Sequence, residues 1–137
     1  MSDPIRVLLI DDEEIFVQSL TKVLKRRGMV VESAGNGALG LECLSQREYD
    51  VIVLDLRMPG MDGVETLKAI RDRDTLTPVL ILSGHIELGQ VSQALREGAE
   101  EILLKPCPVD TLTSAIENAY ERKVCARDVE RTCGEPD

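Results

Sequence analysis

The chain has 137 residues, a length that suits one compact domain with its own hydrophobic core and leaves no room for a second catalytic domain. Its 16 basic and 25 acidic side chains give a net charge of −9, which repels nucleic-acid phosphates, and only one Phe and two Tyr could stack on bases. No apolar run is long enough for a membrane span, and the first residues lack the basic and apolar regions of a secretory signal. We therefore expect a cytoplasmic protein that binds neither nucleic acid nor a membrane directly.

Cysteine usage gives no sign of a metal centre. The four cysteines form no CxxC pair and lie far in sequence from the one histidine, His85; they are Cys43, Cys107, Cys125 and Cys133. This pattern disfavours zinc and favours reduced thiols. Pairing of Cys125 with Cys133 near the end of the chain stays open as the alternative.

Short apolar runs alternate with segments of helical spacing along the chain. In order, the runs expected to form strands are residues 5–10, 30–31, 51–54, 79–82 and 102–104. Four of them are nearly continuous in Val, Ile and Leu, which is typical of parallel strands covered on both faces. The apolar stripes expected on helices fall within residues 17–24, 64–70, 91–95 and 109–116. Gly28 and Gly98 follow the first and third of these stripes, where a glycine can end a helix.

This alternation predicts an α/β fold with five βα units. Right-handed crossovers between parallel strands place helices on both faces of the sheet, so the architecture is doubly wound. We expect the domain to cover residues 1–122. Residues 123–137 show no sustained periodicity, which indicates a frayed tail or a truncated linker.

Polar residues follow the predicted strands at the edge where ligands bind in open α/β sheets. The first run ends at Asp11-Asp12-Glu13, the third at Asp55, the fourth at Ser83-Gly84 and the fifth at Lys105-Pro106. Three crowded carboxylates would repel one another, and a divalent cation would relieve that repulsion. Ligands that are all oxygen favour Mg²⁺ or Mn²⁺.

Each of these features also has an ordinary structural interpretation. The acidic segment at residues 11–13 could cap the following helix, and the residues after Asp55 could form only a turn. Lys105 could be a surface lysine. Their joint placement at strand ends favours a site.

Four segments together resemble the receiver domain of two-component response regulators, over about residues 5–122. They are Asp11-Asp12, the run DLRMPGMDG at residues 55–63, Ser83-Gly84-His85 and Lys105-Pro106. The resemblance implies a flavodoxin-like, chemotaxis-receiver-like fold, with a five-stranded parallel sheet in the order 2-1-3-4-5. Arg57 combined with Ser83-Gly84-His85 is similar to receivers of nitrogen-regulation type activators.

The resemblance also implies a function in phosphorelay signal transduction. Asp55 would accept a phosphoryl group from a histidine kinase or a phosphotransfer protein and become an aspartyl phosphate. Asp12, Asp55 and the backbone carbonyl of Arg57 would bind Mg²⁺ directly, and Asp11 would act through water. Such a protein catalyses only its own phosphorylation and dephosphorylation, so it is not a conventional enzyme.

By the same resemblance, Ser83, Gly84 and Lys105 would contact the phosphoryl oxygens and start the switch. The position where the family usually carries Tyr or Phe holds Ile102, and Cys107 stands where Phe is frequent. We expect a modified output surface on the fourth and fifth helices, which could contact an output domain or a second copy of the chain.

Two other functions use part of the same residue set. A haloacid-dehalogenase-like phosphatase needs an aspartate two residues after its nucleophile, where this chain has Arg57. A pseudo-receiver that binds partners without phosphorylation would not need Asp12, Asp55 and Lys105 together. A free-standing receiver, one from a transcription activator and one from a hybrid kinase would share all of these features.

Overall fold

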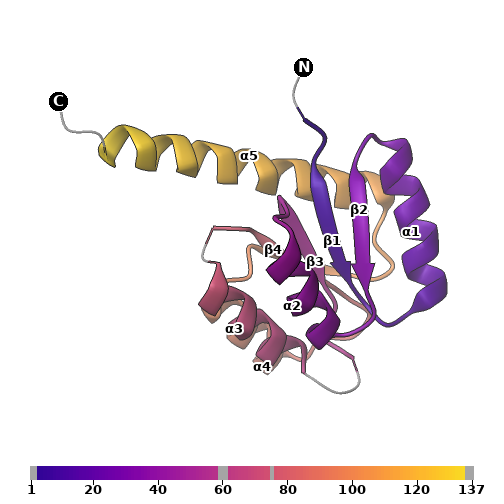
Figure 1. Ribbon diagram of the computed structural model, residues 1–137. Helices are drawn as coiled ribbons and strands as arrows, with labels where there is room; N and C mark the ends of the chain where they lie inside the picture. Colours follow the sequence, from indigo (N-terminus) through magenta and orange to yellow (C-terminus); the bar gives the residue numbers. More distant parts are fainter. Residues whose placement is uncertain (1–2, 59–61, 75, 135–137) are drawn as a thin grey trace.

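A computed structural model describes residues 3–58, 62–74 and 76–134. Strands and helices alternate along these residues (Figure 1). In chain order they are β1 (Arg6–Ile10), α1 (Glu14–Arg26), β2 (Val30–Ala34), α2 (Gly37–Gln46), β3 (Val51–Leu54), α3 (Gly63–Arg73), β4 (Val79–Ser83), α4 (Leu88–Arg96), β5 (Glu101–Leu104) and α5 (Val109–Gly134). The predicted succession of βα units is therefore confirmed.

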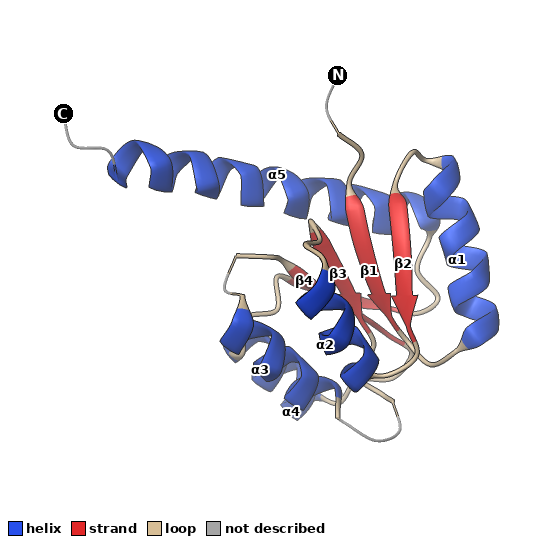
Figure 2. Ribbon diagram, in the orientation of Figure 1, coloured by secondary structure: helices blue, strands red, loops and turns tan. Residues whose placement is uncertain are grey.

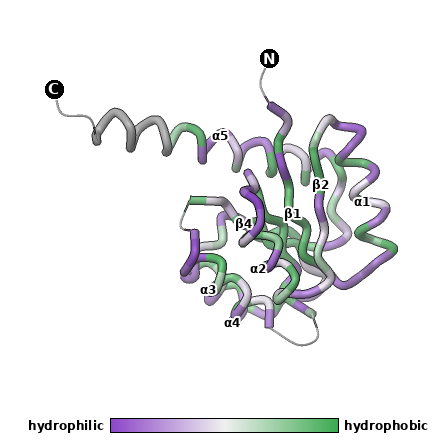
Figure 3. Tube along the Cα trace, in the orientation of Figure 1, coloured by the Kyte–Doolittle hydropathy of each residue, from purple (hydrophilic) through white to green (hydrophobic). Residues whose placement is uncertain are grey.

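The strands form one parallel sheet in the order β2-β1-β3-β4-β5. This is the order that the resemblance implied, and it places β1 beside β3. Figure 2 shows the helices packed on both sides of the sheet, as a doubly wound fold requires. In Figure 3, β1 is mostly hydrophobic along its length, whereas α1 alternates between hydrophobic and hydrophilic residues.

Each face of the sheet has its own hydrophobic core, because successive strand residues point to opposite faces. In β1, Val7 and Leu9 pack under α1 and α5, whereas Leu8 and Ile10 pack under α2, α3 and α4. All four of these side chains are at most 1% exposed. Burial on both faces explains why the strand sequences are continuous in apolar residues.

The helix ends follow from local chemistry. Asn36 accepts a hydrogen bond from the backbone N–H of Leu39 at 2.9 Å, and Asp62 accepts one from Val64 N–H at 3.1 Å, so these side chains cap α2 and α3. Gly28 after α1 has φ of +87°, a left-handed conformation that glycine adopts without strain.

Gly63 allows α3 to begin close to the residues that follow β3. A Cβ at this position would lie 2.3 Å from Leu56 Cα and 2.7 Å from Leu56 O. Only a residue without a side chain can make this approach. Gly63 therefore helps to fix the backbone next to Asp55.

Two elements differ from what hydrophobic periodicity alone indicates. β5 is an edge strand that is only partly covered: Ile102 and Leu103 are half-buried, and Leu104 is 60% exposed. α5 continues beyond residue 122 to Gly134 and extends past the strands in Figure 1. The interpretation of the segment as a tail or a truncated linker stays a prediction. The domain boundary at residue 122 stays a prediction.

Charged side chains attach this continuation of α5 to the domain. Lys123 Nζ donates hydrogen bonds to Tyr49 O at 3.1 Å and to Thr77 Oγ1 at 3.4 Å. Arg122 pairs with Glu100 at 3.2 Å. These contacts take the place of an apolar stripe, which is why hydrophobic periodicity did not reveal the helix.

Candidate functional site

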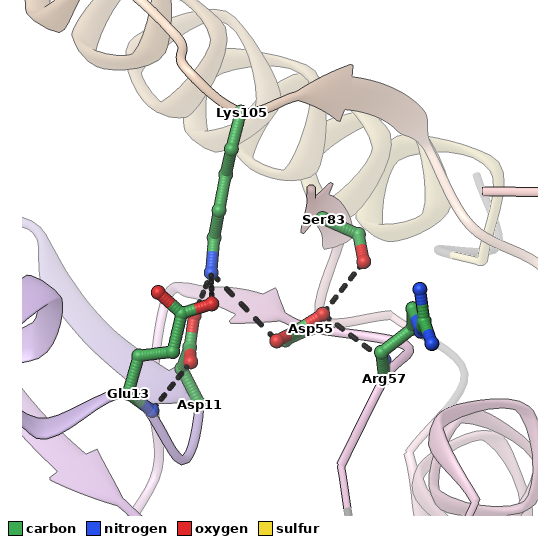
Figure 4. A network of polar contacts seen from close by, with 6 residues as sticks. All are labelled: Asp11, Glu13, Asp55, Arg57, Ser83 and Lys105. Atoms are coloured by element: carbon green, nitrogen blue, oxygen red, sulfur yellow. Dashed lines mark hydrogen bonds and ion pairs between the residues drawn. The ribbon is translucent and has the colours of Figure 1, made fainter. Parts of the chain in front are cut away.

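The carboxyl ends of neighbouring strands bring the polar residues together. Ile10 and Leu54 are paired across β1 and β3, so the residues that follow them, Asp11 and Asp55, lie side by side. On the other side of β3, Lys105 N–H donates to Ser83 O at 2.9 Å, which aligns the ends of β4 and β5. The sheet order thus places four of the predicted site residues at one edge (Figure 4).

Three carboxylates form the acidic part of the site. Asp11, Asp12 and Asp55 each offer an oxygen, and these oxygens lie within 4.8 Å of one another. Asp11 and Asp55 are each only 3% exposed, whereas Asp12 is exposed. Hard oxygen donors that converge in this way, with one side open to solvent, fit a Mg²⁺ ion.

Asp55 is held by donors on one oxygen and faces a cation on the other. Oδ1 accepts hydrogen bonds from Ser83 Oγ at 2.6 Å and from the backbone N–H of Arg57 at 3.0 Å. Oδ2 lies 3.7 Å from Lys105 Nζ. The Arg57 side chain is exposed and points away from Asp55 in Figure 4.

The Lys105 side chain reaches into the site and its ammonium contacts several residues. Its Nζ lies 2.7 Å from Asp11 Oδ2, 3.2 Å from Glu13 Oε1 and 4.2 Å from the centre of the Phe16 ring. The Lys105 side chain is only 10% exposed. Burial alone would lower the pKa of its ammonium, but the hydrogen bond to Asp11 and the charges of Asp11 and Asp55 raise that pKa overall. Lys105 is therefore a cation at this edge of the sheet.

Burial lowers the pKa of a lysine but raises the pKa of a carboxyl group, as it does at the neighbouring Asp11. It raises the pKa of the Asp11 carboxyl, and the nearby charge of Asp55 adds to the rise. The hydrogen bonds from Lys105 and from the Glu13 backbone oppose this rise without cancelling it. Because the charged form of Asp11 is disfavoured here, a cation that binds beside Asp11 and Asp55 would relieve the electrostatic cost of holding the two carboxylates together.

Two side chains in the site were not recognised as such from the sequence. Glu13 follows Asp11 and Asp12 at the end of the first apolar run, where its sequence position indicated no role beyond a possible helix cap; its side chain makes no capping hydrogen bond and pairs with Lys105 instead. Phe16 was counted only as a rare aromatic. They lie three residues apart at the start of α1, so both face the same neighbour, and that spacing was the signal available in the sequence.

The remaining predicted positions lie around this centre. Gly84 and His85 follow Ser83 at exposed positions. Ile102 is half-buried on β5 and packs against the core under α3 and α4, and Cys107 is half-buried against the opposite core. An aliphatic side chain thus occupies the place where the family usually has an aromatic switch residue.

Comparison with known families agrees with this geometry. Residues 7–117 match the model described as the response regulator receiver domain. The chain belongs to the response regulator receiver family. A receiver is a signalling module and does not turn over an external substrate, so the phosphatase interpretation is set aside.

Similar proteins include longer regulatory proteins. The chain is 34% identical over 127 residues to the DNA-binding transcriptional regulator NtrC of Escherichia coli K12, with 90% of this chain and 27% of NtrC covered. It is 31% identical over 124 residues to the regulatory protein AtoC of the same organism, with the same coverage. The receiver thus spans about a quarter of the length of these relatives, 27% in both cases.

A solved receiver shares both fold and sequence. The crystal structure of a response regulator receiver domain protein from Clostridium thermocellum has a TM-score of 0.84 and 33% identity, and the match covers 89% of this chain and 98% of that one. Among the residues that the structure describes, no helix is both long and apolar enough to cross a bilayer.

Proposed function

We propose that this receiver accepts a phosphoryl group on Asp55 from a histidine kinase or a phosphotransfer protein, in a reaction that needs Mg²⁺. The observation that supports this best is the environment of Asp55. It is a buried carboxylate beside two other acids, with a hydroxyl donor at 2.6 Å from one oxygen and an ammonium at 3.7 Å from the other. No structural role of a surface turn requires this combination.

The contacts of Asp55 indicate which oxygen reacts. Oδ1 already accepts hydrogen bonds from Ser83 and from the Arg57 backbone. Oδ2 faces Lys105 and is the oxygen available for attack. A new bond would form between Oδ2 and phosphorus while the bond from phosphorus to the donor's histidine nitrogen breaks, and Lys105 would stabilise the negative charge on the phosphoryl oxygens.

The acidic triad supplies the proposed metal site. Asp12, Asp55 and the Arg57 carbonyl would hold Mg²⁺ directly, with Asp11 acting through water. The bound ion would neutralise the charge where a carboxylate meets a phosphoryl group. The exposed position of Asp12 leaves an entrance for it.

Ser83 supports a link between phosphorylation and output. Its hydroxyl would leave Asp55 for a phosphoryl oxygen, which would shift the end of β4 and the start of α4. Gly84 N–H would donate to the same group. Because Ile102 has no aromatic ring to rotate, the shift would reach the α4 and α5 surface through aliphatic packing.

That surface would contact an output domain or a second copy of the chain. Exposed apolar side chains on α4 and on β5, the strand before α5, are Leu88, Leu95 and Leu104, at 87%, 51% and 60% exposure. The similarity to transcriptional regulators supports a place in a longer cytoplasmic regulator, in which a different region binds DNA.

The proposal is tested by incubating the protein with a small acyl phosphate and measuring its intact mass. We expect the mass of one phosphoryl group to be gained with Mg²⁺ and not after chelation with EDTA. An unchanged mass with Mg²⁺ present would refute the proposal. Replacing the acyl phosphate with a phosphorylated histidine phosphotransfer domain tests the proposed class of donor.

A further inference from the structure

The Lys105 ammonium is close to three carboxylates, which have different proposed roles in phosphorylation. Its shortest contact, 2.7 Å, is to Asp11, which belongs to the acidic triad. Its contact to Asp55 is longer, at 3.7 Å. Between these lies the contact to Glu13 at 3.2 Å, and Glu13 is outside the triad.

Lys105 and a bound divalent cation would compete for Asp11. The ammonium now donates to Asp11 Oδ2, and the carboxylates of the triad would be the ligands of Mg²⁺. Engaging Asp11 with a metal ion weakens its bond with Lys105, because two cations then share one carboxylate. The cost of this exchange depends on where else the ammonium can bind.

Glu13 and Phe16 offer that second place. The Glu13 carboxylate is within ion-pair distance, and the face of the Phe16 ring lies 4.2 Å from Nζ, within the range of a cation–π contact. The start of α1 fixes both residues: Val17 N–H donates to Glu13 O at 2.9 Å in its first turn. Neither side chain belongs to the proposed metal or phosphoryl-binding set.

We propose that Glu13, assisted by the Phe16 ring, is a positioning group that holds the Lys105 ammonium when Asp11 is engaged by a cation, and that it thereby increases the affinity of the site for Mg²⁺. This inference rests on the proposed metal site. Glu13 acts through Lys105 and does not touch the reacting atoms.

An alternative origin of the same effect is the negative charge of Glu13 itself, which would attract Mg²⁺ without involving Lys105. The two origins differ in their dependence on Lys105. A positioning role disappears when Lys105 loses its charge, whereas direct attraction persists. Direct attraction would also extend to Glu14, the next residue, which is exposed and makes no ion pair with any described residue.

The test is calorimetric titration of Mg²⁺ into the unphosphorylated protein. We expect Glu13→Gln to weaken Mg²⁺ binding about two- to fivefold, the range of a partly exposed ion pair, and Glu14→Gln to leave it unchanged. In a Lys105→Met background, adding Glu13→Gln should have no effect. Phe16→Leu should weaken binding in the same direction as Glu13→Gln but by less.

Three results would overturn the inference: equal affinities for wild type and Glu13→Gln, an equal loss in Glu13→Gln and Glu14→Gln, or a loss that persists in the Lys105→Met background. Failure of the proposed function is separate, because it would be an absence of Mg²⁺ binding by the wild type. A matched urea unfolding curve for each variant identifies any loss of affinity that is due to misfolding, and a loss explained in this way also counts against a positioning role.

Discussion

The Ser83 hydroxyl donates a 2.6 Å hydrogen bond to Oδ1 of Asp55, across the ends of the neighbouring strands β4 and β3. Ser83 is fully buried, and Asp55 is 3% exposed. The group proposed to bind the phosphoryl oxygens is therefore already bonded to the acceptor. After phosphorylation at Oδ2, movement of the hydroxyl to a phosphoryl oxygen would break its bond to Oδ1, which would tie the chemistry to movement at the end of β4.

Replacing Ser83 should reveal the strength of this contact. We expect Ser83→Ala to lower the free energy of unfolding by about 1–3 kcal/mol, because a buried carboxylate loses a hydroxyl donor. Ser83→Thr keeps the hydroxyl and should lose less. Urea unfolding of both variants measures the difference, and equal losses would show that the hydroxyl is not the stabilising group.

The ammonium of Lys105 should matter for signalling after phosphorylation. We expect Lys105→Ala to impair the phosphorylation-induced change in partner binding or oligomeric state more than Lys105→Arg, because the arginine keeps a cation near the phosphoryl group despite its different geometry. The comparison is made at matched levels of phosphorylation. An equal loss in both variants would contradict an electrostatic role.

Gly63 and Gly89 form a matched pair near the starts of two helices. We expect Gly63→Ala to destabilise the domain by at least about 2 kcal/mol, because its Cβ would lie 2.3 Å from the Leu56 backbone. Gly89 has open space around it, so Gly89→Ala should be neutral or stabilise α4 by about 0.5–1 kcal/mol. Thermal unfolding separates the two. Similar melting temperatures would mean that α3 can shift away from Leu56 at little cost.

Asp74 should give the domain a stability that depends on pH. It accepts hydrogen bonds from the backbone N–H groups of Leu76 at 2.8 Å and Thr77 at 3.1 Å, and from the Thr77 hydroxyl. Burial acts to raise the pKa of the Asp74 carboxyl, but these bonds and the charge of Lys123 lower it below its usual value of 3.8. A lowered folded-state pKa stabilises the protein above the unfolded-state value, and the gain is lost as pH falls through the folded-state pKa.

We therefore expect Asp74→Ala to lower the free energy of unfolding by about 1–3 kcal/mol near neutral pH. The difference in the free energy of unfolding between Asp74→Ala and wild type should narrow as the pH drops below about 3.8, the unperturbed pKa of an aspartate. Asp72→Ala is the control, because Asp72 is an exposed aspartate only two residues away, in the last turn of α3. Urea unfolding across an acid series gives both curves, and a gap that is independent of pH would exclude the charge of Asp74 as the cause.

Much of the fold and the centre of the site could be predicted because parallel strands leave a strong pattern. Continuous apolar runs identify strands buried on both faces, and their ends must meet at one edge, which placed Asp11, Asp55 and Lys105 together. The apolar pattern by itself does not distinguish the edge strand β5 from a central strand, because its residues Ile102 to Leu104 are as apolar as those of β3; only the family resemblance implied its place at the edge.

Contacts made by charged side chains were harder to predict. The pairing of Glu13 with Lys105 joins residues 92 positions apart and depends on where the β1–α1 loop sets the carboxylate. The continuation of α5 is anchored by Lys123 and Arg122, whose partners come from other parts of the chain. Hydrophobic periodicity carries no information about such pairs.

The central claim is that Asp55 is the residue that receives the phosphoryl group. The most direct measurement is borohydride reduction of the phosphorylated protein, which converts an aspartyl phosphate to homoserine, followed by mass mapping of the peptides. We predict homoserine at position 55, with no label in Asp55→Asn under the same conditions. Homoserine at Asp11 or Asp12, or full labelling of Asp55→Asn, would contradict the assignment.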